Sequence, residues 1–242
     1  MSPDLTNMQS ITFVVPALNE ERALADTVAV IRSAATRVSL DHEIIVVDDG
    51  STDGTFAVAN RLAQEQTSLS VIRHKTNLGL GAAYKTGVKA SRKHYLILVP
   101  ADDVWPEEAL VQILGRLGEA DIIIPYIELA GDKSAFRRLL SRIYTAGINF
   151  LFRLSVPYYN GIVVHRTDLI RSVTIRADDF SYQTEALVKL LRHGHDFVSV
   201  PTRTRARPSG RSKAFGVRNV TRVLKSIFVL FVETHFFKAE RP

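Results

Sequence analysis

The chain of 242 residues contains no cysteine, one tryptophan and two methionines. Without cysteine it forms no disulfides and no thiolate metal sites, so any bound metal must rely on oxygen or imidazole ligands. It also lacks an uncharged apolar run of about 20 residues, the length that a membrane-spanning helix needs. No basic segment followed by a long apolar run opens the sequence, and we therefore expect no signal peptide.

The composition is that of a globular protein with one large or two small domains, because 46% of the residues are hydrophobic and 23% are charged. The formal net charge of +6 favours anionic partners such as nucleotides or phospholipid surfaces. No recognisable nucleic-acid module or interleaved basic and aromatic run is present, so we expect no nucleic-acid partner.

The segment 43–55, EIIVVDDGSTDGT, changes character halfway along its length. Residues 44–47 are all apolar and β-branched, which favours a buried strand. Acidic, glycine and hydroxyl residues follow, and apolar residues at helical spacing resume after Thr55. A strand, a polar turn and a helix in this order form the ligand crevice of open α/β sheets, so we expect an α/β fold with a site here. A plain βα turn with a capped helix explains the same residues.

The apolar run 11–15 predicts an earlier strand, which leads into the polar turn PALNEE. We expect Pro16 to end this strand, because proline has no amide hydrogen for the ladder. Asn19 is expected to cap the helix that follows. The other strands predicted from apolar runs are 69–73, 95–99, 121–125, 162–165 and 197–201.

Carboxylates also follow the run 95–99, at Asp102 and Asp103. They can cap the next helix, or they can hold a hard divalent cation that bridges to a diphosphate. Upstream, Gly79 and Gly81 open a helix of small residues. Glycines there let a helix N-terminus come close to a phosphate, although a tight turn explains them equally well.

Four motifs stand in register along the chain: VPALNE at 15–20, VVDDGSTDGT at 46–55, NLGLG at 77–81 and ADD at 101–103. Together they resemble glycosyltransferase family 2, and the resemblance extends from residue 11 to about residue 213. It implies a GT-A fold, with a mostly parallel Rossmann-like sheet flanked by helices. It also implies a nucleotide-sugar donor and inversion at the anomeric carbon.

By this resemblance the donor site is lined by the ends of the predicted strands. Asp48 would read the base, and Asp102 would approach the ribose and the metal-bound diphosphate. The metal would be Mg²⁺ or Mn²⁺, held by Asp102 and Asp103. Pro100 replaces the first acid of the family's Asp-x-Asp, which weakens the expectation of a metal. The implied donor-binding set is Pro16, Asn19, Glu20, Asp48, Asp49, Gly50, Gly79, Gly81, Asp102 and Asp103.

Relatives that glycosylate sugar hydroxyls carry a Glu-Asp pair about a dozen residues before a Gly-Tyr or Gly-His turn. Here the turn is Gly194-His195, and Tyr182-Gln183 occupies the position of the base. The run YQTE at 182–185 instead resembles the Phe-Gln-x-Glu of polyprenyl-phosphate glycosyltransferases, the dolichol-phosphate mannose synthase group. Their acceptor is a lipid phosphate, which is largely ionised at pH 7 and needs no base.

The basic run 203–213, RTRARPSGRSK, resembles the Arg-x-x-Gly-x-Ser-Lys of the same group. Arginine and lysine suit phosphate oxygens, although a solvated basic loop is the alternative interpretation. The residues expected to stabilise charge on the reacting phosphates are Asp102, Arg207 and Lys213. The set expected at the acceptor phosphate is Arg137, Arg138, Gln183, Arg207, Ser212 and Lys213.

An apolar helix with cations near its start is predicted at 217–238. It either lies at a membrane interface or packs on the core or on a partner chain, as in a homodimer. We divide the chain into a loose N-terminus at 1–10, a catalytic domain at 11–216 and this C-terminal helix at 217–242. Within the catalytic domain, 11–125 forms the nucleotide-sugar half and 126–216 the acceptor half.

The sequence therefore predicts an inverting transferase that moves a sugar from a UDP- or GDP-sugar to a polyprenyl phosphate, at the cytoplasmic face of a membrane. Two alternatives remain. One is transfer to a saccharide hydroxyl, with Asp178, Asp179 or Glu185 as the base. The other is a catalytically silent protein that binds nucleotide sugars, which Pro100 makes conceivable.

Overall fold

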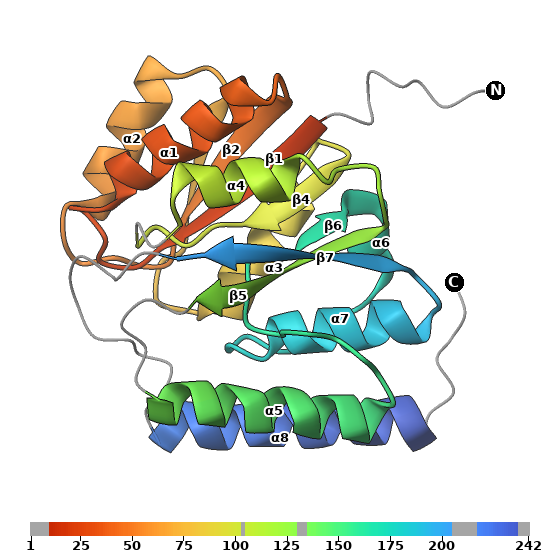
Figure 1. The fold of residues 1–242 in the computed structure, drawn as a ribbon. Coiled ribbons are helices and arrows are strands. Elements are labelled where there is room, and N and C mark those ends of the chain that lie inside the picture. The colour runs from red at the N-terminus through yellow and green to blue at the C-terminus, as the bar shows by residue number, and fades with distance from the viewer. Residues whose placement is uncertain (1–9, 103–104, 130–134, 205–216, 237–242) are drawn as a thin grey trace.

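The fold is built on one seven-stranded sheet with the strand order β3-β2-β1-β4-β6-β5-β7 (Figure 1). The structure is a computed structural model and describes residues 10–102, 105–129, 135–204 and 217–236. The strands are β1 (Ser10–Ala17), β2 (Asp41–Asp48), β3 (Leu69–Arg73), β4 (Tyr95–Leu98), β5 (Ile122–Leu129), β6 (Val164–Arg166) and β7 (Phe197–Arg203). Within the sheet only β6 runs antiparallel to its neighbours β4 and β5, so the predicted mostly parallel α/β fold is confirmed.

Helices cover both faces of the sheet. They are α1 (Leu24–Arg37), α2 (Thr55–Glu65), α3 (Leu80–Ala90), α4 (Glu107–Leu114), α5 (Ala135–Phe152), α6 (Thr167–Ser172), α7 (Tyr182–Arg192) and α8 (Val217–Phe236). One core cluster joins the sheet to α1, α2 and α4, and a second joins it to α3, α5, α6, α7 and α8. In Figure 1, α5 and α8 lie side by side beyond α7, away from the sheet.

The central strands form because their apolar, β-branched runs are buried on both faces, as is usual for parallel sheets. All eight residues of β1 are buried, and so are the last six of β2. Full burial of a Val or Ile side chain contributes about 1.5–3 kcal/mol, so these two strands anchor the fold. Their parallel register pairs Ala17 with Asp48, which aligns their carboxyl ends.

Two local predictions about the first βα turn are wrong. Pro16 does not end β1, because the strand continues to Ala17 and the carbonyl of Pro16 accepts a hydrogen bond from the amide of Ala101 at 3.2 Å. Asn19 does not cap α1, because that helix begins at Leu24, and the Asn19 side chain instead accepts a hydrogen bond from the amide of Thr52. Both residues thus accept hydrogen bonds from the turns that follow neighbouring strands, β4 for Pro16 and β2 for Asn19.

The C-terminal helix α8 has two apolar faces. Leu230 is buried, and Ile227 and Phe231 pack partly buried against the second core cluster. Phe152 of α5 meets Phe231 with ring centroids 6.2 Å apart, which ties the two helices together. The opposite face of α8 leaves Leu224, Phe228 and Val229 exposed. Among the helices that the structure describes, none combines the length and the apolar character required to cross a bilayer.

Candidate active site

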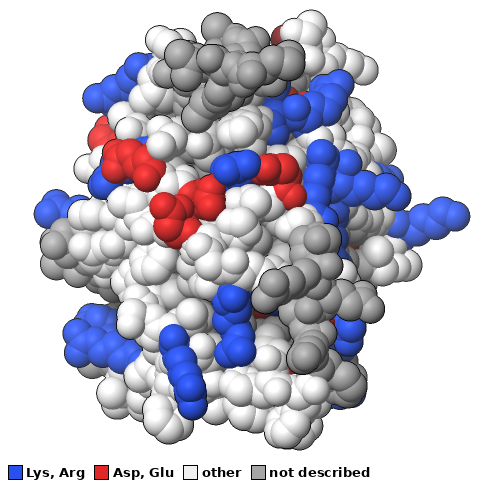
Figure 2. Space-filling view, turned by 90° about the vertical axis from the view of Figure 1, so that its right-hand side faces the viewer, with Lys and Arg blue, Asp and Glu red and all other residues white. Residues whose placement is uncertain are grey.

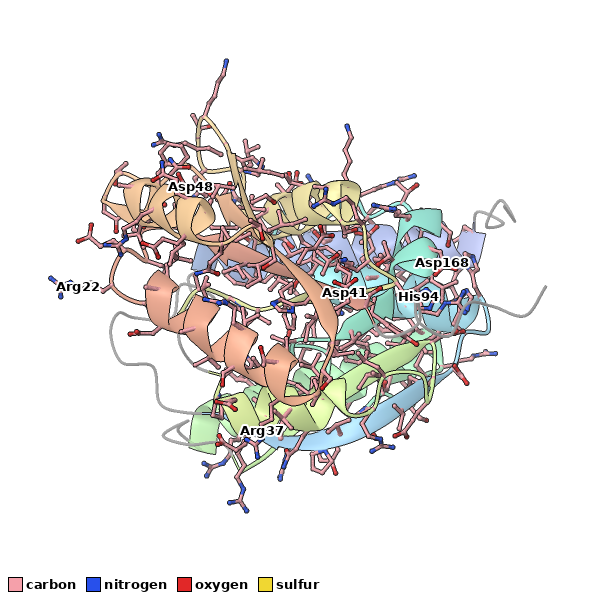
Figure 3. The ribbon with its side chains drawn as sticks, turned by 90° about the horizontal axis from the view of Figure 1, so that it is seen from above. Arg22, Arg37, Asp41, Asp48, His94 and Asp168 are labelled. Atoms are coloured by element: carbon pink, nitrogen blue, oxygen red, sulfur yellow. The ribbon has the colours of Figure 1, made fainter. Side chains whose placement is uncertain are left out.

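The candidate site lies where the carboxyl ends of β1, β2 and β4 meet. The amide of Asp49 donates to the carbonyl of Ala17 at 2.9 Å, and the amide of Ala101 donates to Pro16, so three strand ends stand side by side. Figure 3 shows Asp48 and Asp41 at opposite ends of β2, with His94 and Asp168 together on the Asp41 side. The acidic motifs of the sequence thus converge on one edge of the sheet, as open α/β folds require.

Asp48 is fully buried at the end of β2. Its Oδ1 accepts a hydrogen bond from the amide of Ser51 at 3.0 Å, and its Oδ2 lies 3.0 Å from Nε of Arg73. The Arg73 guanidinium also stacks on the ring of Phe56, 4.2 Å from its centroid. The carboxylate is enclosed by protein in this arrangement, so the base-reading role of Asp48 stays a prediction.

Asp49 organises the neighbouring glycine turn rather than facing solvent. It is 4% exposed, and its carboxylate accepts hydrogen bonds from the amides of Leu78 and Gly79, both at 2.9 Å. Nδ1 of His74 lies 2.7 Å from the same carboxylate. Gly50 has φ +75°, and a Cβ on it would stand 2.5 Å from the backbone of Thr76, so glycine is required there. The two residues join the end of β2 to the turn before α3.

The turn after β1 is cross-linked to the turn after β2 by backbone and side-chain hydrogen bonds. The amide of Asn19, which has φ +58°, donates to Oγ of Ser51 at 3.0 Å. The amide of Glu20 donates to Oγ1 of Thr55 at 2.8 Å. Asp53 accepts a hydrogen bond from the amide of Thr55, the first residue of α2. Burial acts to raise the pKa of Asp53, but hydrogen bonds from Thr55 and Glu21 outweigh burial and hold this pKa below its usual value. Two predicted donor-binding residues, Asn19 and Glu20, are thereby fixed relative to Asp48.

Gly79 and Gly81 approach the backbone of a distant segment. The amide of Gly81 donates to the carbonyl of Asp178 at 2.9 Å. A Cβ on Gly79 would stand 2.4 Å from that oxygen, and one on Gly81 would stand 2.4 Å from the carbonyl of Ala177. The close approach that these glycines permit is made to protein backbone. A nucleotide above these glycines stays a prediction.

Asp102 is the described carboxylate at the end of β4, and it is partly exposed. Asp103, its predicted companion, lies outside the described residues. Across the described ranges there is no group of three or more His, Asp or Glu side chains that would hold a metal alone. A single carboxylate still fits Mg²⁺, which proteins commonly bind through one or two carboxylates together with substrate phosphates.

The predicted base position at the start of α7 is occupied by a neutral buried pair. The amide nitrogen of Gln183 lies 3.1 Å from Nε2 of His165, and the two side chains are 4% and 0% exposed. Burial lowers the pKa of His165 to about 3, so its ring is neutral at physiological pH. Gln183 therefore donates to His165, and its predicted contact with an acceptor phosphate stays a prediction.

The three carboxylates considered as alternative bases all have protein partners. Glu185 is 6% exposed and accepts hydrogen bonds from the amide of Ala177 and from Lys189. Asp178 lies 2.6 Å from Nζ of Lys85, and Asp179 accepts a hydrogen bond from the amide of Ser181. A general base needs a carboxylate within reach of substrate, and Glu185 is the least accessible of the three.

The predicted acceptor-phosphate residues fall mostly beyond what the structure describes. Arg138 is exposed near the start of α5. The side chain of Arg137 and all of Arg207, Ser212 and Lys213 lie outside the described residues, so their roles stay predictions.

Arg73, His74 and Ser51 were not predicted as site residues, yet all three contact the acidic pair of β2. Arg73 is the last residue of β3, and His74 directly follows it. Acids occupy the corresponding strand-end positions after β2 and β4. A basic residue at that position is the signal in the sequence that points to them.

Comparison with known proteins gives a family and a fold. The family model described as "Glycosyl transferase family 2" matches residues 12–175. An undecaprenyl-phosphate mannosyltransferase from Micrococcus luteus is 28% identical over 226 residues, covering 86% of this chain and 91% of that protein. A polyprenol monophosphomannose synthase from Mycolicibacterium smegmatis is 30% identical, covering 86% of this chain and 82% of that protein.

Solved structures with the same fold include the glucosyl-3-phosphoglycerate synthase of Mycobacterium tuberculosis. Its complex with Mn²⁺, UDP-glucose and phosphoglyceric acid matches with a TM-score of 0.70 at 17% identity, covering 92% of this chain and 80% of that chain. Its complex with Mg²⁺ and UDP matches with the same TM-score and covers 79% of that chain. These likenesses establish the fold.

Proposed function

This chain belongs to glycosyl transferase family 2 and is a glycosyltransferase of the GT-A fold, and on that premise we propose that it transfers a sugar from a nucleoside diphosphate sugar to a polyprenyl phosphate. The observation that carries the proposal is the pair of Gln183 and His165 at the predicted base position. A neutral amide there takes no proton from a sugar hydroxyl. A lipid phosphate needs none removed, because its second pKa is near 6 by analogy with phosphorylated side chains.

The reaction is a single displacement. An oxygen of the lipid phosphate attacks the anomeric carbon, a new carbon–oxygen bond forms, and the bond from that carbon to the diphosphate breaks. The nucleoside diphosphate leaves with the bonding electrons, and attack from the opposite face inverts the anomeric configuration. The chain's own task is to orient both phosphates and to stabilise their charge.

We propose that the donor binds at the strand ends of β1, β2 and β4. UDP and UDP-glucose occur in the crystal structures of the neighbouring fold, and two relatives are named as mannose transferases, which supports a nucleoside diphosphate sugar. Asp102 would contribute a carboxylate to a Mg²⁺ or Mn²⁺ ion bound together with the donor. When bound, such a cation supplies positive charge that offsets the charge developing on the diphosphate.

Access to a lipid acceptor is supported by the apolar surface of α5 and α8. Leu139, Ile143 and Phe150 on α5 are exposed, as are Leu224 and Phe228 on α8. Between them the two helices carry six Arg and Lys residues and a single acid, Glu233, which faces Lys189. Figure 2 shows the same end of the molecule as largely uncharged surface with scattered Lys and Arg side chains.

An apolar face flanked by cations suits the interface of an anionic bilayer, where acyl chains and headgroups meet it together. We therefore place α5 and α8 on a membrane surface. Its cytoplasmic side stays a prediction. A homodimer formed through the same face is the competing arrangement, and the vesicle experiment described below separates the two.

The test of the function is transfer of a radiolabelled sugar from a panel of UDP- and GDP-sugars to a short polyprenyl phosphate, with Mg²⁺, with Mn²⁺ and with EDTA. We expect one donor to give an organic-soluble product with inverted anomeric configuration, and EDTA to suppress it. Nucleotide binding without product from any donor would point to the silent binder. Product on a soluble saccharide alone would point to a hydroxyl acceptor.

The contribution of Asp102 is tested by Asp102→Asn. We expect kcat/KM to fall about a hundred-fold, because a carboxylate that helps to hold the diphosphate is lost. Asp26→Asn, an exposed residue of α1, is the matched control and should leave kcat/KM unchanged. Equal activity of the two variants would remove Asp102 from the donor site.

A further inference from the structure

A cluster of charges joins α7 to α8, in which Lys189 and Glu185 are buried and Glu233 is partly exposed. Nζ of Lys189 lies 2.7 Å from Oε1 of Glu185 and 3.1 Å from Oε1 of Glu233, and it donates to the carbonyl of Thr174 at 2.6 Å. Lys189 and Glu185 are 9% and 6% exposed. Three acceptors match the three hydrogens of the ammonium group, so its position is fixed by all of them. Glu185 is the nearer and more buried of the two carboxylates, so its removal, rather than that of Glu233, would leave the Lys189 charge poorly compensated.

The same cluster holds the 174–179 segment, which precedes α7. Glu185 accepts hydrogen bonds from the amides of Arg176, at 3.0 and 3.1 Å, and of Ala177, at 2.9 Å. From α8, Oγ of Ser226 donates to Oδ2 of Asp179 at 3.2 Å. The backbone of the 174–179 segment is therefore attached on one side to α7 and α8.

On its other side the 174–179 segment supports the glycine turn at 79–81. The amide of Gly81 donates to the carbonyl of Asp178, and a Cβ on Gly79 would collide with the same oxygen. That turn is also bound by Asp49, which follows the last residue of β2. Contacts thus run without interruption from Glu233 on α8 to the acidic end of β2.

We propose that Lys189 and Glu233 are positioning residues of the donor site. Through Glu185 and the 174–179 segment they hold the glycine turn, so that the placement of α8 sets the affinity for the donor nucleotide. The inference rests on the proposed function, because it takes the glycine turn and the end of β2 as the donor site. The affinity for the nucleotide reports this energetic coupling directly.

The experiment compares the wild-type chain of 242 residues with Glu233→Gln, and with Glu65→Gln as the matched control. Glu65 is exposed on α2, away from the cluster. In Glu233→Gln, Lys189 keeps Glu185 and the carbonyl of Thr174, so we expect an unchanged unfolding temperature. Binding of UDP and of GDP is titrated with Mg²⁺ present. For the nucleotide that binds, we expect Glu233→Gln to weaken affinity about five-fold or more and Glu65→Gln to leave it unchanged.

Hydrogen exchange on the same three proteins shows which segments lose protection when Glu233 is changed. We expect amides at 76–84 and 174–179 to exchange faster in Glu233→Gln than in the other two proteins. Equal nucleotide affinity in wild type and Glu233→Gln would overturn the inference alone. Weaker affinity without faster exchange at 76–84 would also overturn it, because the effect would bypass the glycine turn. A wild-type chain that binds neither nucleotide would overturn the proposed function and this inference with it.

Discussion

Two glycines with similar positive φ angles differ in what surrounds them. Gly79 has φ +104°, and a Cβ on it would stand 2.4 Å from the carbonyl oxygen of Asp178. Gly118 has φ +90°, and nothing lies within 4 Å of its Cβ position. Backbone strain from a side chain is common to both positions, but only Gly79 adds a collision with backbone. Alanine substitutions at the two positions therefore differ in whether the new Cβ collides with neighbouring backbone.

We predict that Gly79→Ala lowers the free energy of unfolding by at least about 2 kcal/mol more than Gly118→Ala does. Alanine at 118 meets strain alone, whereas alanine at 79 must also displace the 174–179 segment. Urea denaturation of the two variants and of wild type measures the difference. Equal losses would mean that the segment yields without cost, and the glycine turn would then not be held from that side.

His165 gives the fold a dependence on pH. Burial lowers its pKa in the folded chain to about 3, whereas the unfolded value is about 6.5. Between these values the unfolded state binds more protons, so stability is fully present above about pH 6.5 and decreases as the pH falls toward 3. One proton difference corresponds to a slope of up to about 1.4 kcal/mol per pH unit.

We predict that His165→Gln removes this part of the slope. Glutamine keeps a polar partner for Gln183 but has no proton to gain in this range. Urea denaturation between pH 7 and pH 4 measures the free energy of unfolding for both chains, and the difference between them isolates the histidine from the carboxylates. Parallel curves for the two proteins would show that His165 does not titrate in this way.

At the scale of elements, α8 has one face that packs on the core and one apolar face that is exposed. Ile227, Leu230 and Phe231 share one face at helical spacing and pack inward. Leu224 and Phe228, four residues apart, lie on the outward face and are 61% and 67% exposed. A helix that needed only to pack on the core would not require large apolar residues on its outward face.

We predict that Phe228→Glu reduces binding to vesicles of equal parts phosphatidylglycerol and phosphatidylcholine about ten-fold or more, with an unchanged unfolding temperature. An exposed phenylalanine inserts into the interface, whereas a carboxylate is repelled by the anionic headgroups. Ala29→Glu, which adds the same charge to an exposed position of α1, is the control. Sedimentation of protein with vesicles measures the binding.

The same proteins test the competing arrangement. A wild-type chain that ignores vesicles but forms a dimer, and that Phe228→Glu converts to a monomer, would identify the outward face as a protein interface. Light scattering of both proteins in the absence of vesicles measures the oligomeric state.

At the scale of the whole molecule, the parallel strands were predictable because they are mostly apolar runs rich in β-branched residues. The paired strands β1 and β2 contain such runs at 11–15 and 44–47. The sequence misled at Pro16, because a proline can remain in a strand whose neighbour uses only its carbonyl. The order of β6 between β4 and β5 was not predictable, because β6 has three residues and its partners lie far away in sequence.

In the candidate site, some residues were predictable from the sequence and their contact partners were not. Asp48, Asp49 and Asp102 were predictable because acids follow strands directly in the sequence. Their partners were not, since the contact of Gly81 with Asp178 joins residues about a hundred positions apart. Glu185 is an example of a residue whose long-range contacts the sequence does not reveal. It was considered as a base in the sequence, yet its carboxylate is buried beneath the 174–179 segment and Lys189.

The acceptor that we propose is a lipid phosphate, and transfer to it requires no protein base. The most direct test compares transfer to a short polyprenyl phosphate with transfer to the polyprenol of the same chain length, using the donor that the panel identifies. We predict transfer to the phosphate alone, with a rate that falls on acidification only as the acceptor itself becomes protonated, near pH 6. Comparable transfer to the free alcohol, or transfer confined to a soluble saccharide, would contradict the account.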